Sequence, residues 1–477
     1  MKMLAVEIVT EELPPKALKA LGESFSTTLT DELRRRNLLT DESVPTGYAT
    51  PRRLAVTISD VRAKAPDAEA VDKLMPAKVA LPDGKPSEAL RRKLASLGRA
   101  ELADAWPLTP ALAPRAERGR DANGNAPMYV ASDGKAEYVY LRRHVPGVSL
   151  ADALQAALDV ALARLPIPKL MHYPAPGHYY NDVEFVRPAH RLVALHGADV
   201  VPLVALGLVA DRMSAGHRFL ARSDLSIATA DAYVPTLEAE GKVLPSFAAR
   251  RAKIVEALAA AAGNDRVIMP DALLDEVTSL VEWPVVYAGT FDAAFLAVPQ
   301  ECLILTMQQN QKYFALASVE GALVNRFLLV SNTPSDGASA IVHGNERVLR
   351  ARLADAKFFY DHDRRTPLAS RVPRLSTIVY HNRLGSLGDR VERLRALSRA
   401  IAPHVGADPA LADRAALLAK ADLVTDMVGE FPELQGTMGR YYAQADGEPA
   451  SVADAIADHY RPRYAGDALP SDPVAQS

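Results

Sequence analysis

The stretch "MLAVEIVTEELPPKALKALG" (residues 3–22) changes its periodicity at a pair of prolines, and this change predicts a strand followed by a helix. Leu4, Val6 and Ile8 occupy alternate positions, which is typical of a strand with one buried face. From Leu18 onward the apolar residues recur every three or four positions, as on the buried side of an amphipathic helix. The chain therefore begins with mixed α/β structure.

Two adjacent carboxylates, Glu11 and Glu12, lie at this junction, and they are either a catalytic acid–base pair or part of the turn. Pro14 and Pro15 suit the first turn of a helix, where a missing N–H group costs nothing, and nearby acids are stabilised by the helix dipole. Adjacent side chains also point apart, so they do not converge on one substrate atom. We interpret the pair as structural.

The totals describe a globular chain of several domains. At 477 residues, a typical size of about 150 residues per domain predicts roughly two to four units. Hydrophobic residues make up 49% and charged residues 24%, which excludes a disordered tail or a membrane span. The net charge of −3 provides no overall attraction to nucleic acid. Any contact with RNA must therefore come from local basic patches.

Cysteine use and the pattern at the N-terminus indicate a cytoplasmic protein. Cys302 is the only cysteine, which excludes an internal disulfide and a thiolate cluster and suits a reducing compartment. Its apolar surroundings favour a buried small residue over a nucleophile. We expect no secretory signal, and the apolar stretch at 200–210 is too short to cross a bilayer.

The pattern divides the chain into two regions. Residues 1–336 predict an α/β region, with a loosely patterned excursion at about 62–128. Within this region, residues 311–332 resemble a hairpin whose turn includes Gly321. After "NTPSDGASA" (332–340) helical spacing dominates, so residues 337–477 predict a helical domain.

The segment "GNERVLRARLADAKFFYDHD" (344–363) is the best candidate for contact with nucleic acid. On a helix one face is apolar and buried, comprising Leu349, Leu353, Ala356 and Tyr360. Arg347, Arg350 and Lys357 occupy the adjacent quadrant, where they can follow RNA phosphates. The alternative is a solvated face, because Glu346 and Asp355 partly neutralise the charge.

Two further basic groups are weaker candidates. "SAGHRFLAR" (214–222) is expected to be a strand with Arg218 and Arg222 on the same side, available to RNA or to the acids of a partner. The alternative is that His217 is a turn or packing residue. Arg52 and Arg53, in a Thr-Pro-Arg-Arg turn, are less favoured.

The run "AALLAKADLVTDMVGEFPELQGTMGRYYA" (415–443) predicts a helix that ends near Gly429 and Pro432, with Asp422 and Asp426 one turn apart on its polar side. The expected buried stripe consists of Leu417, Ala421, Val424 and Val428. Two carboxylates are too few ligands for a hard metal ion, and no histidine spacing matches a zinc site. The chain also lacks a phosphate-binding glycine loop, a nucleophile elbow and an HExxH motif. We therefore predict no metal site, no catalytic residue and no ATP motif.

Seven segments resemble, in order, the signatures of the bacterial glycyl-tRNA synthetase β subunit. They are "EIVTEELPPKAL", "FVRPAHRLVAL", "GHRF", "FDAAFLAVPQECLILTMQQNQKYFAL", "GNERVLRARLADAKFFYDHD", "LGSLGDRVERL" and "KADLVTDMVGEFPELQGTMGRYYA". The resemblance implies an α2β2 enzyme that attaches glycine to tRNA(Gly). It further implies that the α subunit forms the adenylate using ATP and Mg²⁺, while the β subunit binds tRNA and has no cofactor of its own.

The resemblance also implies an α+β multidomain fold. It predicts a B3/B4-like N-terminal part and, from about Gly344, an all-helical HD-like domain that is incomplete at Ser477 because the family continues beyond this point. Arg191 departs from the family pattern, which usually has an aromatic residue after the preceding histidine. The consecutive His-Asp of working phosphohydrolases is not expected at a matching place.

Two alternatives belong to other classes. One is an HD-type metal-dependent phosphohydrolase, which requires His381, Asp422 and His459 to converge. The other is a scaffold that binds the α subunit and never contacts RNA.

Overall fold

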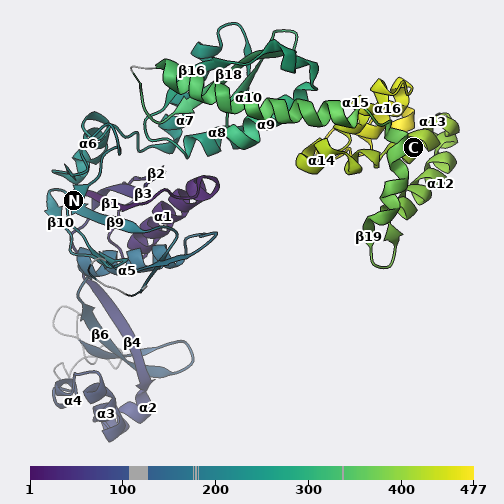
Figure 1. The fold of residues 1–477 in the computed structure, drawn as a ribbon. Coiled ribbons are helices and arrows are strands. Elements are labelled where there is room, and N and C mark those ends of the chain that lie inside the picture. The colour runs from purple at the N-terminus through teal and green to yellow at the C-terminus, as the bar shows by residue number, and fades with distance from the viewer. Residues whose placement is uncertain (107–126, 176, 178–179, 181, 336–337) are drawn as a thin grey trace. The chain divides into compact units, whose positions relative to one another are not determined.

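The computed structural model describes the 477 residues of the chain except 107–126, 176, 178–179, 181 and 336–337. Contacts within the chain define two compact units, Met1–Gly241 and Lys242–Ser477. Both units combine helices with small antiparallel sheets (Figure 1), which agrees with the predicted α+β class. The change of pattern near residue 336 falls within the second unit, where a long helix begins at Ala338.

The first unit is built on a five-stranded antiparallel sheet with the order β10–β9–β1–β3–β2. Its strands are β1 (Lys2–Thr10), β2 (Pro45–Thr50), β3 (Arg53–Val61), β9 (Ala189–His196) and β10 (Asp199–Val200). Helices α1 (Pro15–Arg35) and α5 (Leu150–Ala163) pack on it and on each other. Gly22 of α1 permits this close approach, because a Cβ atom there would lie 2.6 Å from Cβ of Ala49.

The predicted strand–helix junction is confirmed, with one difference. Leu4, Val6 and Ile8 are buried against the two helices, as the alternation predicted. Glu7 on the opposite face is also fully buried. The second face is covered because Ala215 and Tyr233 lie over it and bind side chains of the sheet.

The excursion has a small core of its own. A three-stranded sheet, β4–β6–β5, packs with three short helices around Leu90, Leu94 and Met128. Part of the predicted excursion, residues 107–126, lies outside the described residues. The elements are β4 (Ala68–Pro76), α2 (Ala77–Ala80), η1 (Pro82–Gly84), α3 (Glu88–Ser96), α4 (Glu101–Asp104), β5 (Met128–Ser132) and β6 (Glu137–Val145).

Short elements complete the first unit. They are β7 (Met171–Tyr173), β8 (Val183–Phe185), β11 (Val204–Ala205), β12 (Leu208–Val209), β13 (Met213–Ser214), β14 (Leu225–Ser226), η3 (Ala230–Ala232) and α6 (Tyr233–Ala239). The segment 214–222 was predicted to be a strand, and this prediction is wrong: β13 ends at Ser214 and residues 218–220 form a turn. The turn is stabilised because Nδ1 of His217 accepts hydrogen bonds from the N–H groups of Phe219 and Leu220.

The second unit begins with a four-stranded antiparallel sheet, β15–β17–β18–β16, between two layers of helices. The hairpin β17–β18 is confirmed, and Gly321 in its turn has a φ of +89°, which favours glycine. The elements are α7 (Phe247–Ala262), β15 (Arg266–Ile268), α8 (Asp271–Thr278), β16 (Val285–Thr290), η4 (Ala293–Ala297), α9 (Gln300–Gln311), β17 (Phe314–Ala317) and β18 (Leu323–Ser331).

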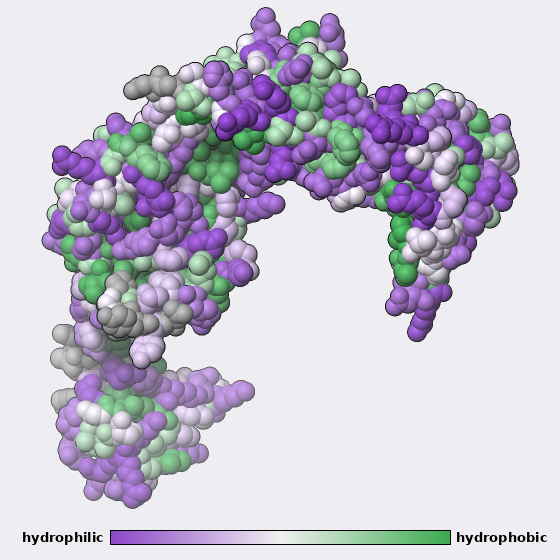
Figure 2. All heavy atoms as spheres, viewed as in Figure 1, coloured by the Kyte–Doolittle hydropathy of each residue, from purple (hydrophilic) through white to green (hydrophobic). Residues whose placement is uncertain are grey.

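The remainder of the second unit is mainly helical and begins with α10 (Ala338–Asp363), the longest helix in Figure 1. Figure 2 shows hydrophobic residues on the stem of the hairpin β19–β20 and hydrophilic residues at its tip. The elements after α10 are α11 (Leu368–Arg371), η5 (Val372–Thr377), β19 (Val379–His381), β20 (Gly385–Ser386), α12 (Leu387–Val405), α13 (Pro409–Leu418), η6 (Ala421–Val424), α14 (Asp426–Glu430), η7 (Pro432–Leu434), α15 (Thr437–Ala445), α16 (Ala450–Asp458) and α17 (Pro473–Gln476).

Candidate nucleic-acid interface

The orientation of α10 is determined by its apolar stripe. Leu349, Leu353 and Ala356 are fully buried and Tyr360 is nearly so, as the helical spacing predicted. This stripe packs in one core with residues of α9, α14 and α15. The quadrant beside the stripe must therefore face outward, because a rigid helix presents fixed faces.

Arg350 lies in that quadrant, whereas Arg347, which was predicted there, lies nearly opposite the stripe; both are exposed. Within the described part of the chain, neither guanidinium has a carboxylate at ion-pair distance. Glu346, which was expected to neutralise them, instead accepts hydrogen bonds from the backbone N–H and the hydroxyl of Thr290, at 2.8 and 3.0 Å. The Glu346 carboxylate is thus bound to the sheet, and the two arginines remain available to an external anion.

Lys357, the third predicted member, is half-buried and paired within its own helix. Its Nζ lies 2.6 Å from Oδ2 of Asp361, one turn further on. An exposed i,i+4 pair of this kind stabilises a helix by only about 0.5 kcal/mol. Lys357 can therefore leave Asp361 and bind a phosphate at a small cost in free energy.

An exposed aromatic residue on the same side was missed by the sequence analysis. Phe358 is 62% exposed and stacks on His362 with ring centroids 5.9 Å apart. It follows Arg347 by eleven residues, which is close to three full turns and places both side chains on one side of α10. Helical geometry at about 100° per residue places Phe358 outside the buried stripe, so its exposure could have been predicted from the sequence.

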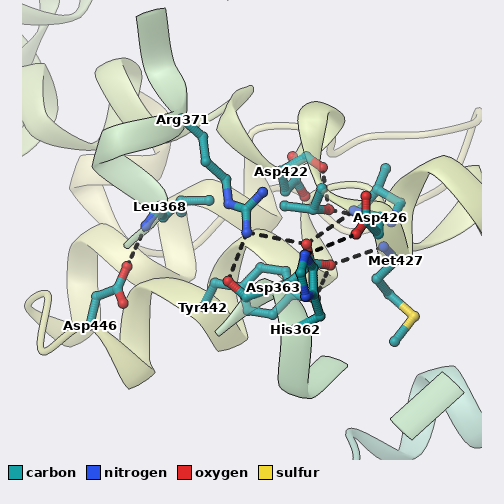
Figure 3. Close-up of polar contacts among 11 residues, drawn as sticks. His362, Asp363, Leu368, Arg371, Asp422, Asp426, Met427, Tyr442 and Asp446 are labelled. Atoms are coloured by element: carbon teal, nitrogen blue, oxygen red, sulfur yellow. Dashed lines mark hydrogen bonds and ion pairs between the residues drawn. The ribbon is translucent and has the colours of Figure 1, made fainter. Parts of the chain in front are cut away.

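Asp363, the last residue of α10, attaches this helix to the helices that follow (Figure 3). It is 2% exposed, and its two oxygens accept backbone N–H groups of Asp426 and Met427, each at 3.0 Å. Oδ2 also accepts the hydroxyl of Tyr442 at 3.0 Å. Arg371 lies 3.2 Å from Oδ1 and donates to the Asp363 carbonyl at 2.8 Å.

This arrangement makes Asp363 a structural anion. A carboxylate at the first N–H groups of α14 is stabilised by the partial positive charge of a helix start. Burial, followed by the charge of Asp363, raises the pKa of Tyr442, so its hydroxyl remains a donor. Since both oxygens are bound to protein donors, Asp363 is not free to hold a metal ion.

The residues required by the phosphohydrolase alternative do not form a metal cluster. His381 is exposed on β19, Asp422 is buried in η6, and His459 follows α16. Residue 363 does follow a histidine, and Nε2 of His362 lies 3.7 Å from Oδ2 of Asp426. Throughout the described ranges, however, no group of three or more His, Cys, Asp or Glu side chains is placed to hold a metal ion.

The predicted continuous helix around Asp422 is also wrong. Helix α13 ends at Leu418, the short turn η6 follows, and α14 begins at Asp426. Asp422 is fully buried because it accepts backbone N–H groups of Gly436 and Gly439, at 2.5 and 3.1 Å. Burial raises its pKa to about 6 despite these donors. It therefore lies in the interior, whereas the sequence placed it on the polar side.

Arg218 is bound to the two carboxylates at the first strand–helix junction. Its guanidinium lies 2.8 Å from Glu11 and 3.2 Å from Glu12, and Nε2 of His190 lies 3.0 Å from Glu11. Glu11 and Glu12 thus hold the turn after β13 against β1, which agrees with their structural interpretation. Arg222 in the same segment is exposed.

We expect Arg218→Gln to lower the free energy of unfolding by about 0.5–1 kcal/mol, because the pair is partly exposed. Burial would raise the pKa of Glu11, but hydrogen bonds from Arg218 and His190 outweigh it and leave this pKa below the ordinary 4.5. The carboxylate therefore stabilises the fold above pH 4.5, and the contribution is lost as the pH falls through the lowered pKa. Urea unfolding at pH 7 and pH 3 measures this: the difference between wild type and variant should shrink at pH 3. If the two proteins differ in stability by the same amount at pH 3 as at pH 7, the ionised Glu11 carboxylate is not what Arg218 stabilises.

Arg53 was a candidate for contact with RNA, and its burial excludes it. It is fully buried, and it donates to Oε1 of Glu7 at 2.8 Å and to the carbonyl of Ala215 at 2.9 Å. Tyr233 donates to the same Glu7 oxygen at 2.7 Å. Arg52 is half-buried at the β2–β3 turn. Arg53 therefore ties the sheet to the segment that covers it, and it cannot reach an external phosphate.

Antiparallel sheets packed against helices, a mainly helical C-terminal part and, on α10, an exposed basic face with an adjacent aromatic ring define an α+β chain. The profile of the glycyl-tRNA synthetase beta subunit family matches residues 4–477, and the chain belongs to this family.

Curated relatives agree over nearly the whole chain. It is 52% identical over 472 residues to the glycine–tRNA ligase beta subunit of Ralstonia nicotianae, covering 98% of this chain and 65% of that protein. The corresponding protein of a Janthinobacterium species is 52% identical over 480 residues, covering 99% and 65%. That of Paracidovorax citrulli is 53% identical over 487 residues, with the same coverage. The chain thus spans about two thirds of the length of these relatives.

Within the described residues, no helix is sufficiently long and apolar to cross a membrane.

Proposed function

We propose that this chain binds tRNA(Gly) and positions it for ATP-dependent attachment of glycine at the active site of a partner α subunit, as part of a cytoplasmic α2β2 glycine–tRNA ligase. The names of the relatives, each a beta subunit of this ligase, supply the reaction and imply the α partner. ATP and Mg²⁺ are then used by the complex through the α subunit. The chain contributes orientation, which accelerates a reaction by holding the substrate in a productive geometry.

The exposed side of α10 carries the proposal. Arg347 and Arg350 have no acidic partner in the described residues and lie on the same side of the helix as exposed Phe358. Cationic groups that follow phosphates, together with an aromatic ring on which a base stacks, are the usual elements of RNA recognition. Phosphate contacts of this kind fix the register of a nucleic acid without reading its sequence.

The attachment of α10 makes this face suitable for positioning. Its stripe is packed in a core, and Asp363 at its end is bound by Arg371 and Tyr442. A ligand held on a rigid element is placed more accurately than one held on a loop. Arg222 is a secondary candidate, and Arg218 less so because it is engaged by Glu11 and Glu12.

The finer domain assignment follows the family resemblance. We propose that the α/β part before α10 includes the B3/B4-like region, and that the helices from about Gly344 form the HD-like domain. The predominance of helices after Ala338 supports the second assignment.

A titration of labelled tRNA(Gly) with the chain, alone and with the α subunit added, tests the proposal. Binding by the chain alone that weakens as salt is raised is the expected result. Binding that appears only when the α subunit is present would favour the scaffold alternative and contradict the proposal.

A further inference from the structure

A pocket in the C-terminal helices is not explained by the proposed tRNA-binding face. Its volume is about 590 Å³, within the range of sites that hold small molecules. Helices α12, α13, α16 and α17 and the turn η6 contribute to it. Much of the wall is apolar and includes Leu394, Ala412, Ala415, Ala416 and Leu423.

Lys420 lines this pocket and is unusual for its burial. It is only 6% exposed, and its Nζ lies 3.8 Å from the ring centroid of Tyr460. Among the residues that the structure describes, no carboxylate lies at ion-pair distance from it. Lysine is almost never buried unless it is paired. Burial removes water from the Lys420 ammonium, and the contact with the Tyr460 ring replaces only part of that hydration. An anion that enters the pocket therefore stabilises the ammonium group.

Arg390 brings a second positive charge to the same pocket. Its guanidinium lies 4.3 Å from the ring centroid of Tyr380, and it has no ion pair in the described part of the chain. Burial, and then the charge of Arg390, lower the pKa of Lys420 to about 8, against the weaker attraction of Asp422. Both cations therefore line one pocket.

Two neutral polar groups complete the wall. Nδ1 of His459 lies 2.8 Å from the carbonyl of Ile456 and must carry the proton. Nε2 is therefore a buried acceptor that has no hydrogen-bond partner among the described residues. Burial, followed by the charge of Lys420, lowers the pKa of His459 to about 4, so the ring is neutral at pH 7. The hydroxyl of Tyr460 is likewise buried, and no described residue forms a hydrogen bond with it.

Among the described residues, the nearby acids leave Lys420 and Arg390 without an ion pair. Asp422 does not line it, and Oδ2 of this residue is bound by the N–H groups of Gly436 and Gly439. Asp458 lies 3.4 Å from Arg461, which is a third basic residue of the wall. The lining contains no acidic side chain, and two of its three basic side chains, Lys420 and Arg390, have no ion pair among the described residues, with an apolar surface beside them.

We propose that this pocket binds a phosphate group between Lys420 and Arg390, with the rest of the ligand against the apolar wall. An arginine fork and a lysine point charge are the usual pair of groups that bind phosphate. The phosphate belongs either to a small phosphorylated molecule or to an RNA strand, since both present the same group. The proposal does not depend on the tRNA contact of α10.

The test measures whether phosphate protects Lys420 in the intact 477-residue chain. An amine-reactive acylating reagent at pH 8 should modify Lys420, and inorganic phosphate, AMP or a 5′-phosphorylated RNA oligonucleotide, at constant ionic strength, should slow this. Protection by phosphate or AMP assigns a small-molecule source, and protection by RNA alone assigns an RNA phosphate. Either result supports the pocket, and the absence of protection by all three overturns it.

Calorimetric titration with the most protective probe gives the second measurement. Lys420→Met and Arg390→Met should each weaken binding at least tenfold. Lys253→Met is the matched control, because Lys253 also lies over an aromatic ring, 4.5 Å from Trp283, but is exposed and outside the pocket. Equal weakening by the control, or unchanged binding in Arg390→Met, would overturn the proposal.

Discussion

Replacement of Asp363 by alanine is expected to lower the free energy of unfolding of the second unit by about 3–5 kcal/mol, the usual cost of removing one partner from a buried ion pair. The substitution leaves the Arg371 guanidinium, 8% exposed, without its carboxylate. It also leaves the N–H groups of Asp426 and Met427 and the hydroxyl of Tyr442 without their acceptor. The effect is large because several buried donors lose one shared partner.

Urea unfolding followed by tryptophan fluorescence measures this loss. The chain has two tryptophans, and Trp106→Phe leaves Trp283 as the reporter of the second unit. Asp361→Ala is the control on the same helix. Among the described residues the half-exposed Asp361 pairs only with Lys357, so its loss should lower the free energy of unfolding by less than about 0.5 kcal/mol. Similar unfolding midpoints for the Asp363 and Asp361 variants would show that the buried network does not stabilise this unit.

The combined change Arg347→Gln, Arg350→Gln and Lys357→Gln is expected to weaken binding of tRNA(Gly) about 10- to 150-fold at 0.15 M salt, because each lost charge contact costs about 0.5–1 kcal/mol. All three side chains lie outside the buried stripe of α10, so the fold should be retained. The slope of log affinity against log salt should become shallower by about 2, since fewer counterions are released from the RNA.

A control variant with the same change in net charge distinguishes loss of RNA contacts on α10 from a general effect of lower positive charge. Arg91, Arg92 and Lys93 are exposed on α3 in the first unit, and their replacement by glutamine removes three positive charges there. We expect this variant to retain most of its affinity and its salt dependence. Equal losses in both triple variants would mean that α10 has no special role.

The elements that could be predicted from the sequence were those whose pattern is local. The strand from Leu4 and the buried stripe of α10 follow from the spacing of apolar residues, which reports one face of one element. The exposure of Arg347 and Arg350 followed from the same geometry. The hydrogen bonds between Thr290 and Glu346 could not be predicted in this way, because the two residues meet only through the packing of β16 beside α10.

Two of the errors share a physical cause, which is burial by another segment of the chain. Arg53 looked like a surface residue, but Ala215 and Glu7 bind it in the interior. Asp422 looked polar and exposed because the helix was assumed to continue, whereas backbone N–H groups of Gly436 and Gly439 draw it inward. Local periodicity carries no information about such partners.

The turn around Arg218 was mispredicted for a different, local reason. Alternation over a few residues predicted a strand, yet His217 binds the following backbone and closes a turn. Side chains that bind nearby backbone groups compete with strand pairing. The Lys420 pocket was also missed, because its walls come from α12, α13 and α16, which are separated in the sequence.

Photochemical cross-linking of tRNA(Gly) to the chain, followed by identification of the attached peptide, tests the central claim most directly. If α10 holds the RNA, cross-links should concentrate in the peptide from Arg347 to Phe358, and excess unlabelled tRNA(Gly) should abolish them. Cross-links confined to other segments, with this peptide recovered unmodified, would contradict the assignment of the RNA-binding face to α10.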